Sequence, residues 1–372
     1  MGDNPILWEP SAERRKSSAM YRFMRQQGFD DYEALYQWSV EDSPAFWGAL
    51  CTFCDVRFAQ PPETVLKHPD TIMHAGWFDG STLNYAEHLL RHEGAGEALV
   101  FSAEDGGRRT LSFDELRESV AAVAGGLKRA GVVKGDRVGG YLPNCPEAII
   151  AMLATTSIGA IWSSCSPDFG VTGVVDRFGQ IEPKVLFTAN AYFYNGKRFD
   201  CLATVAQIVE EILAIQQTVV VPFASGTSDI SGIGNAVMLE AFADAGAGLS
   251  FEPVAFDHPL FIMYSSGTTG VPKCIVHGHG GTLLQILKEH VLHCDTGPGD
   301  RLFYFTTCGW MMWNWLATGL ATGATLVLFD GSPFYNDGRV LWQMAEREKL
   351  SVFGTSAKYI SALQKAGVRP RD

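Results

Sequence analysis

The ten residues 264–273 constrain the fold of this chain more than any other stretch. They read Tyr-Ser-Ser-Gly-Thr-Thr-Gly-Val-Pro-Lys and join two apolar segments, 259–263 and 274–277, whose residue types predict buried strands. Glycines let such a turn curl so that successive backbone N–H groups point inward, while the hydroxyls and one lysine add donors. Because the turn contains no carboxylate, we expect it to bind an anion, most simply a polyphosphate. The alternative is a solvated hairpin turn.

The spacing excludes a Walker A loop, because the lysine lacks the required preceding glycine and is followed by a predicted strand instead of a helix. The order instead resembles the phosphate loop of the AMP-forming acyl-CoA synthetases and their adenylate-forming relatives. That resemblance implies ATP bound through Ser265, Ser266, Gly267, Thr268, Thr269, Gly270 and Lys273, with Thr268 and Lys273 in catalysis. It also implies Mg²⁺ sharing the phosphate charge. Cys274 stands where the family usually has glycine, which leaves the phosphate donors untouched.

Composition limits the remaining possibilities. A chain of 372 residues is long for one domain, and 47% hydrophobic with 19% charged residues is typical of a globular protein with a large core. A formal net charge of −12 argues against nucleic-acid binding, which needs a basic surface. Eight cysteines without framework spacing, and a start without a signal pattern, indicate a cytoplasmic protein with free thiols.

Two uncharged stretches, 148–167 and 302–329, are long enough to span a bilayer. Both are interrupted by threonines and glycines and lack basic flanks, so we expect a buried α/β core and no membrane span. Cys51 and Cys54, and likewise His277 and His279, have the spacing of metal ligands but lack further partners nearby. We therefore predict no protein-held metal site, and we expect Gly280 and Gly281 to allow close packing of a helix start.

Strands and helices alternate along most of the chain, which predicts a mainly parallel sheet covered on both faces. Aromatic residues at helical spacing fill 8–60, and a helix is expected at 82–90. Segment 190–198 is interpreted as an aromatic, basic loop and 225–235 as a flexible connector. Further strands are expected at 99–101, 110–112, 136–142, 160–163, 184–188, 219–221, 301–307, 324–329 and 351–354. Further helices are expected at 114–130, 147–159, 202–216, 282–292, 310–320, 341–349 and 357–365.

A second group of residues, 306–315, places three tryptophans and two methionines beside a Gly309 turn. Such a cluster forms an apolar wall with indole and amide donors, although a buried helix start is the alternative. Together with 330–333 and the aromatic 38–47 segment, it resembles the acetoacetyl-CoA synthetase family. The resemblance implies an acyl pocket formed by Trp310, Met311, Met312 and Asn314. We hypothesise that Asn314 or a neighbouring indole donates to the β-keto oxygen of acetoacetate.

The same resemblance covers essentially the whole chain. It implies CoA contacts at Trp162, Ser163, Ser164 and Lys197, although Tyr194 replaces one basic residue there and Lys197–Arg198 could equally be a solvated pair. It predicts an α/β, layered adenylate-forming large-domain fold, incomplete, preceded by a helical aromatic-rich segment. The expected units are 1–95, resembling the N-terminal segment of acetyl-CoA synthetases, and 96–372, a partial AMP-binding domain.

The family's adenine-binding motif, hinge and C-terminal domain find no match before Asp372, and the sheet beginning at Pro259 looks incomplete. We therefore expect this chain alone to be inactive, with the missing part in the same polypeptide or in a separate chain. The leading hypothesis is ATP-dependent, AMP-forming activation of acetoacetate to acetoacetyl-CoA. The alternatives are a ligase for propionate, butyrate or another short acid, and a non-catalytic CoA- or nucleotide-binding remnant.

Overall fold

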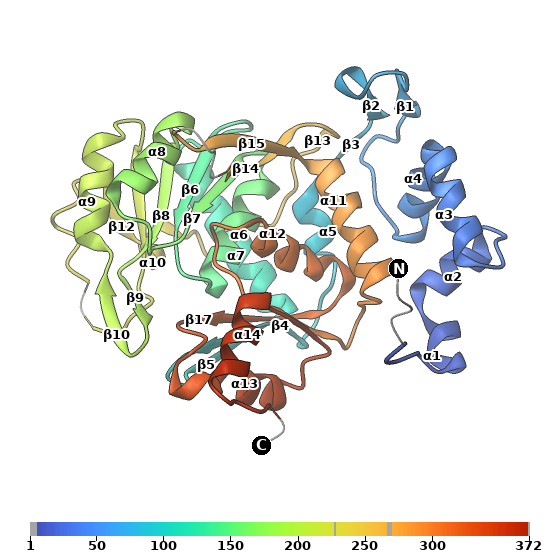
Figure 1. Ribbon diagram of the computed structural model, residues 1–372. Coiled ribbons are helices and arrows are strands. Elements are labelled where there is room, and N and C mark those ends of the chain that lie inside the picture. The colour runs from blue at the N-terminus through green and yellow to red at the C-terminus, as the bar shows by residue number, and fades with distance from the viewer. Residues whose placement is uncertain (1–5, 227, 266–269, 371–372) are drawn as a thin grey trace.

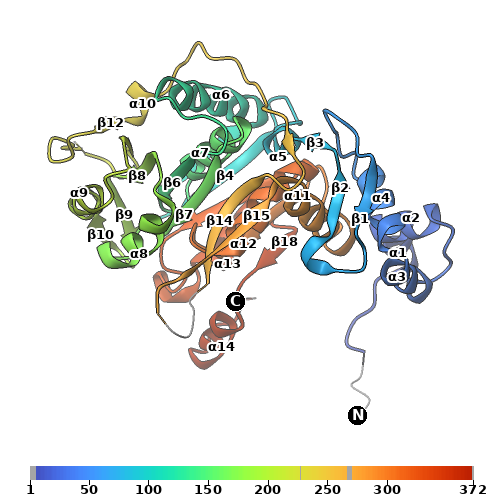
Figure 2. The same cartoon turned by 90° about the horizontal axis from the view of Figure 1, so that it is seen from above.

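The computed structural model describes residues 6–226, 228–265 and 270–370. Two large β-sheets lie between three layers of helices, and a small helical group at the N-terminal end packs at one side (Figure 1). The layers therefore run helix, sheet, helix, sheet, helix, which confirms the predicted α/β layered class. Seen from above, the N-terminal helices lie at the opposite end of the molecule from α8 and α9 (Figure 2).

The first sheet is parallel except at its last strand, which pairs antiparallel with its neighbour. Its order is β12 (Ala236–Met238), β11 (Gln217–Val221), β8 (Val185–Ala189), β6 (Arg137–Tyr141), β7 (Ile161–Cys165), β14 (Pro259–Ser265), β15 (Lys273–Gly278). The helices connected with it are α6 (Phe113–Arg129), α7 (Pro146–Ser157), α8 (Val171–Ile181), α9 (Leu202–Glu211) and α10 (Leu239–Phe242).

The second sheet joins strands from both ends of the chain, and only its β4–β5 pair is antiparallel. Its order is β18 (Val352–Gly354), β16 (Arg301–Tyr304), β17 (Thr325–Asp330), β4 (Glu97–Ala103), β5 (Arg108–Ser112). The helices from β15 onward are α11 (His279–Leu287), which contacts β15 of the first sheet, the π-helix η2 (Lys288–His293), α12 (Met311–Thr318), η3 (Gly319–Thr322), η4 (Asn336–Gly338), α13 (Val340–Glu348) and α14 (Ala357–Lys365).

The central strands of both sheets are buried on both faces, which explains their continuously apolar sequences, whereas the edge strands β5 and β15 are partly exposed. Side chains alternate along a strand, so Leu326 and Leu328 of β17 pack into the central core between the sheets. Val327 and Phe329 of the same strand face α13 and α14 on the other side. A third apolar cluster fills the space between the first sheet and α8 and α9.

The N-terminal segment is helical, as its aromatic spacing predicts. It comprises α1 (Ala12–Ser17), α2 (Ala19–Gln26), α3 (Tyr32–Glu41) and α4 (Ser43–Phe53), followed by the hairpin of β1 (Thr64–Lys67) and β2 (Gly76–Asp79) with η1 (Ile72–His74) between them. The short strand β3 (Thr82–Leu83) pairs with β13 (Val254–Ala255), and α5 (Tyr85–Leu89) follows. Cys51 and Cys54 are buried on α4 and its end, and all eight cysteines are free thiols.

Several sequence predictions are wrong or incomplete in detail, among them the helix expected at 82–90, which begins as strand β3 and is helical only in α5. The strand pair beginning at Pro259 extends the first sheet and does not start a second one. Segment 190–198 is not a loop, because β9 (Ala191–Tyr194) and β10 (Lys197–Asp200) form a hairpin about Asn195–Gly196. Helix α8 was not expected, although three apolar side chains at helical spacing bury one of its faces.

No helix within the described ranges is both long enough and apolar enough to cross a membrane. The stretches 148–167 and 302–329 instead fold into strands and short helices of the core.

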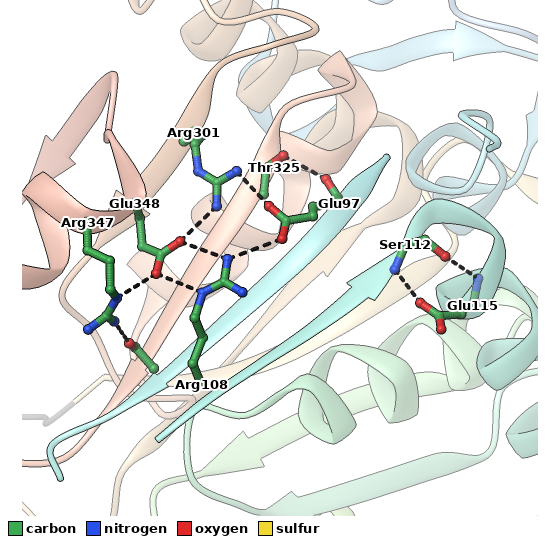
Figure 3. A network of polar contacts seen from close by, with 9 residues as sticks. Glu97, Arg108, Ser112, Glu115, Arg301, Thr325, Arg347 and Glu348 are labelled. Atoms are coloured by element: carbon green, nitrogen blue, oxygen red, sulfur yellow. Dashed lines mark hydrogen bonds and ion pairs between the residues drawn. The ribbon is translucent and has the colours of Figure 1, made fainter. Parts of the chain in front are cut away.

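A network of charged side chains ties the second sheet to α13 (Figure 3). Glu348 is 3% exposed and accepts hydrogen bonds from Arg108 (3.0 and 3.1 Å), Arg301 (3.0 Å) and Arg347 (2.8 Å). Glu97 pairs with the first two of these arginines. One buried carboxylate thus connects β5, β16 and the end of α13.

The start of α11 gives a first prediction. A Cβ on Gly280 would lie 2.1 Å from a ring carbon of Phe256, whereas a Cβ on Gly281 would meet nothing within 4 Å. Gly280→Ala is therefore expected to lower the free energy of unfolding by about 1–3 kcal/mol through overpacking. Gly281→Ala, the matched control, should be neutral or stabilising by up to about 1 kcal/mol through helix propensity. Urea denaturation of both variants tests this, and equal effects would contradict it.

Candidate active site

The carboxyl ends of parallel strands from both sheets meet at one edge of the molecule. Strands β6, β7 and β14 of the first sheet end there at Tyr141, Cys165 and Ser265. From the second sheet, the loops after β16 and β17 reach the same place, where the Ser164 hydroxyl donates to the Cys308 carbonyl (2.7 Å). Ligands of open α/β sheets bind outside the carboxyl ends of the strands, so this edge is the candidate site.

Asn144 holds the two sheets together at this edge. It follows β6, is 2% exposed, and its amide donates to the carbonyls of Thr306 (3.4 Å) and Phe329 (3.3 Å). Its side-chain oxygen accepts from the indole of Trp313 (3.0 Å), and its backbone N–H donates to Asp330 (3.3 Å). Sequence reasoning missed this residue, since an asparagine after a strand has no distinctive local signal.

The predicted phosphate loop leaves this edge between β14 and β15. Ser266, Gly267, Thr268 and Thr269 lie outside the described residues. Its two ends are defined, because Ser265 pairs with Lys273 in the antiparallel register and Gly270 has a φ of +128° that favours glycine. Lys273 is exposed and, among the described residues, forms no ion pair, so its ammonium group can reach an anion.

The base of this loop is fixed by its neighbours. Tyr264 is close to Arg177, whose guanidinium lies 5.8 Å from the ring centre, and burial raises the pKa of the Tyr264 hydroxyl. The amide of Gln180 on α8 donates to the Pro272 carbonyl (2.8 Å). Helix α8 therefore supports the returning arm of the loop.

The tryptophan- and methionine-rich turn, residues 306–315, lies beside β14 and leads into the first residues of α12. Trp310 and Met311 are 67% and 50% exposed at its surface, while Met312 packs against the core. Trp313 and Trp315 already donate their indole N–H groups to Asn144 (3.0 Å) and Glu289 (2.9 Å). Among the described residues, the side-chain donors of this turn that have no protein acceptor are those of Thr307, Trp310 and Asn314.

Asn314 reaches the edge of the first sheet. It is 4% exposed and lines a cavity of about 10 Å³, room for about one water molecule, with Trp162, Ser164 and Met263. The buried indole N–H of Trp162 has no hydrogen-bond partner among the described residues. The structure therefore brings one predicted acyl-pocket residue next to predicted CoA residues on β7.

A larger cavity of about 450 Å³ opens at the same edge. One wall comes from the β9–β10 hairpin (Tyr192, Phe193, Tyr194, Phe199) and the other from the loops after β7, β16 and β17. Asp330 lines it, and burial together with the nearby Glu104 and Asp168 raises the pKa of Asp330 to about 7, although the Asn144 N–H opposes this. A neutral carboxyl group and aromatic rings thus face the cavity below that pH.

The predicted CoA residues fall in two places. Trp162 and Ser163 are each 1% exposed in β7, and Ser163 Oγ lies 2.8 Å from the Ile262 carbonyl oxygen and 3.0 Å from the Tyr264 hydroxyl. Lys197 is exposed to solvent at the start of β10, next to the Asn195–Gly196 turn. Of these residues, only Lys197 has its polar group free at the surface of the hairpin that walls the larger cavity.

The potential metal ligands of the site are few. Within the described ranges, no three His, Cys, Asp or Glu side chains come close enough to hold a metal ion. His279 is buried and accepts from the Tyr85 backbone N–H (3.3 Å), a structural role.

Two family models match the chain. The model described as AMP-binding enzyme matches residues 86–371, and that described as acetyl-coenzyme A synthetase N-terminus matches residues 32–89. The first alone covers more than half of the chain, including the whole edge where the strands end.

Curated proteins and solved structures give the same result. An acetoacetyl-coenzyme A synthetase of Rhizobium meliloti (strain 1021) is 50% identical over 98% of this chain and 57% of its own length. The Gallus gallus acetoacetyl-CoA synthetase is 44% identical, over 99% of this chain and 57% of its own length. The solved structure of acetoacetyl-CoA synthetase from Streptomyces lividans matches with a TM-score of 0.93 and 44% identity, over 99% of this chain and 58% of that one.

This chain thus spans somewhat more than half the length of the relatives it matches. It belongs to the AMP-binding enzyme family and is, within that family, a homologue of the acetoacetyl-CoA synthetases.

Proposed function

We propose that this chain forms part of an AMP-forming ligase that activates acetoacetate to acetoacetyl-CoA through an acyl-adenylate. The observation that carries the proposal is the position of Asn314, held beside β14 at the edge where the phosphate loop leaves the sheet. In this reaction the acid's carboxylate attacks the α-phosphate of ATP and pyrophosphate leaves. The CoA thiol then attacks the acyl carbon and AMP leaves.

The described ends of the phosphate loop fit a polyphosphate. Lys273 is exposed and free of carboxylate partners among the described residues, and Gly270 leaves the backbone room to curl. Ser265, Ser266, Thr268, Thr269 and the loop N–H groups would bind the β- and γ-phosphates, which makes pyrophosphate a better leaving group. Mg²⁺ would supply further charge neutralisation, held mainly by the phosphates because the described residues offer no cluster of ligands.

Recognition of the acid is assigned to the tryptophan- and methionine-rich turn. Of the donors predicted from the sequence, Trp313 and Trp315 are occupied by protein acceptors, so the proposed donor to the β-keto oxygen is Asn314 or the indole of Trp310. Butyrate lacks that oxygen and serves as a matched substrate. CoA would approach through the aromatic cavity of about 450 Å³, with Lys197 available to a phosphate group.

The test uses a polypeptide that continues this chain to the length of its relatives. Asn314→Ala is expected to lower kcat/KM for acetoacetate by about 10- to 100-fold while leaving that for butyrate within about threefold, since only acetoacetate loses a hydrogen bond. Trp310→Phe is the companion variant, because it removes the other proposed donor and keeps an aromatic surface. Equal losses for both acids in Asn314→Ala would contradict the assignment, and absence of acetoacetyl-CoA formation by the parent protein would contradict the proposed function.

A further inference from the structure

Glu104 is a buried carboxylate outside the site described so far, and it does not line the larger cavity. It follows β4, is 5% exposed, and forms no ion pair among the described residues. A buried carboxylate without a cation needs several donors to be tolerated. The hydrogen-bond donors to Glu104 show which two segments its carboxylate connects.

Among the described residues, the hydrogen bonds to the Glu104 carboxylate all come from backbone N–H groups of the two cavity walls. Gly196 donates to Oε1 (2.6 Å), and Asn195 (2.8 Å) and Ser332 (2.7 Å) donate to Oε2. The first two residues are the turn of the β9–β10 hairpin, and the third lies in the loop after β17. The Glu104 backbone N–H also donates to the Asp330 carbonyl (3.2 Å).

The backbone on both sides is shaped for this contact. Asn195 and Gly196 have φ values of +52° and +75°, the left-handed pair of a two-residue hairpin turn. Gly331 has a φ of +132°, and a Cβ there would lie 2.5 Å from Glu104 Cβ. The Gly331 backbone therefore lies directly against the Glu104 side chain, while the hairpin turn presents two N–H groups to its carboxylate.

The hairpin held in this way carries Tyr194 and Lys197 on either side of its turn. Its aromatic residues face Phe329, Asp330 and Pro333 across the cavity of about 450 Å³. Releasing the turn would change the width of the cavity and the place of Lys197 without touching β14 or α12.

We propose that Glu104 is a positioning residue that clamps the β9–β10 turn to the loop after β17 and thereby fixes the entrance through which CoA is bound. The inference rests on the proposed function for the identity of the ligand, but the clamp itself is a property of this chain. It acts on the second half-reaction, because CoA takes no part in formation of the acyl-adenylate.

The test compares Glu104→Gln with Asp105→Asn, the exposed neighbour whose carboxylate, within the described part of the chain, accepts only from the Gly107 N–H (2.9 Å). A glutamine keeps the shape but turns an NH₂ group toward backbone N–H donors. In the 372-residue chain, hydrogen exchange at Asn195, Gly196 and Ser332 is expected to accelerate at least about tenfold in Glu104→Gln and to stay unchanged in Asp105→Asn. Unchanged exchange in Glu104→Gln overturns the clamp.

In the polypeptide of family length, Glu104→Gln should raise KM for CoA at least about tenfold while acetoacetate-dependent ATP–pyrophosphate exchange stays within about twofold. Equal losses in both half-reactions would overturn the positioning role. Gly196→Ala strains the same turn without altering the buried carboxylate. It should likewise raise KM for CoA and leave ATP–pyrophosphate exchange unchanged, and it replaces Glu104→Gln as the test variant if Glu104→Gln folds poorly. A parent protein that forms no acetoacetyl-CoA would count against the proposed function alone. The hydrogen-exchange experiment on the 372-residue chain tests the clamp without any enzymatic activity.

Discussion

Replacing Glu348 by alanine is expected to lower the free energy of unfolding by about 3–5 kcal/mol. The carboxylate is 3% exposed and accepts from three arginines (Figure 3). Its removal leaves Arg108 and Arg301 sharing Glu97 and leaves Arg347 without an ion-pair partner among the described residues. Urea denaturation at pH 7 measures the loss. Glu346→Ala, on the exposed side of the same helix, is the matched control and should change stability by less than about 0.5 kcal/mol.

The same network makes the free energy of unfolding depend on pH in the acid range. Burial alone would raise the pKa of Glu348, but hydrogen bonds from Arg108 and Arg347 outweigh it and lower the pKa to about 2. The folded state therefore binds this proton more weakly than the unfolded state. The stabilisation is complete above the ordinary carboxyl pKa near 4.5 and is lost as pH falls toward 2. Glu348→Gln should flatten this part of the stability profile, and an unchanged slope would show that the carboxylate is not held by its arginines.

Asp330→Asn is expected to stabilise the protein at pH 8, by about 1–4 kcal/mol. Burial raises the pKa of Asp330 to about 7, against a reference value of 3.8, so the folded state binds the proton more tightly than the unfolded state. The resulting stabilisation is present below pH 3.8 and is lost as pH rises through 7. Asparagine can still accept from the Asn144 N–H and carries no charge at any pH.

The measurement is urea denaturation of the parent and the variant at several pH values between 4 and 8. The difference between them should grow as pH rises and level off above 7. Asp337→Asn, an exposed position seven residues later, should show no such growth. A constant difference across the pH range would contradict a raised pKa at Asp330. A carboxyl group that lowers stability at neutral pH beside an open cavity is typical of a residue kept for function.

Local patterns predicted many single elements well. Helix α14 was expected at its observed bounds, because its apolar spacing is regular and Ser356 caps it by accepting from the Tyr359 N–H (3.2 Å). Helix α6 begins with the reciprocal Ser112–Glu115 capping box and ends before Gly131, which has a φ of +74°. Such signals lie within a few residues of the element they define.

The pairing of strands that are far apart in the sequence could not be predicted from local patterns. The pairing of β14 with β7, and of β17 with β4, depends on which buried face meets which, and every apolar strand offers similar faces. The β9–β10 hairpin is a different case. Its Asn195–Gly196 pair between aromatic residues is a strong turn signal, which the basic composition of the segment obscured.

For the site, motif spacing predicted the phosphate loop and the tryptophan- and methionine-rich turn, whose roles stay predictions. Asn144 and Glu104 could not be predicted, because each acts by joining backbone groups far apart in sequence. The structure also separates the indoles of the turn into two that are occupied and one, on Trp310, that remains available, which no sequence pattern indicates.

The order of strands in the second sheet has a consequence for synthesis on the ribosome. The Glu97 carbonyl of β4 accepts a hydrogen bond from Thr325 of β17, 228 residues later. At about 5–20 residues per second, β4 would wait roughly 10–50 seconds for that partner. During this time Leu99 and Val100, fully buried in the finished protein on opposite faces of the strand, have β5, α6 and α7 nearby but lack β17 on the other edge of β4. The second sheet therefore closes late, and nascent chains shorter than about 330 residues expose an apolar strand edge that chaperones would need to protect.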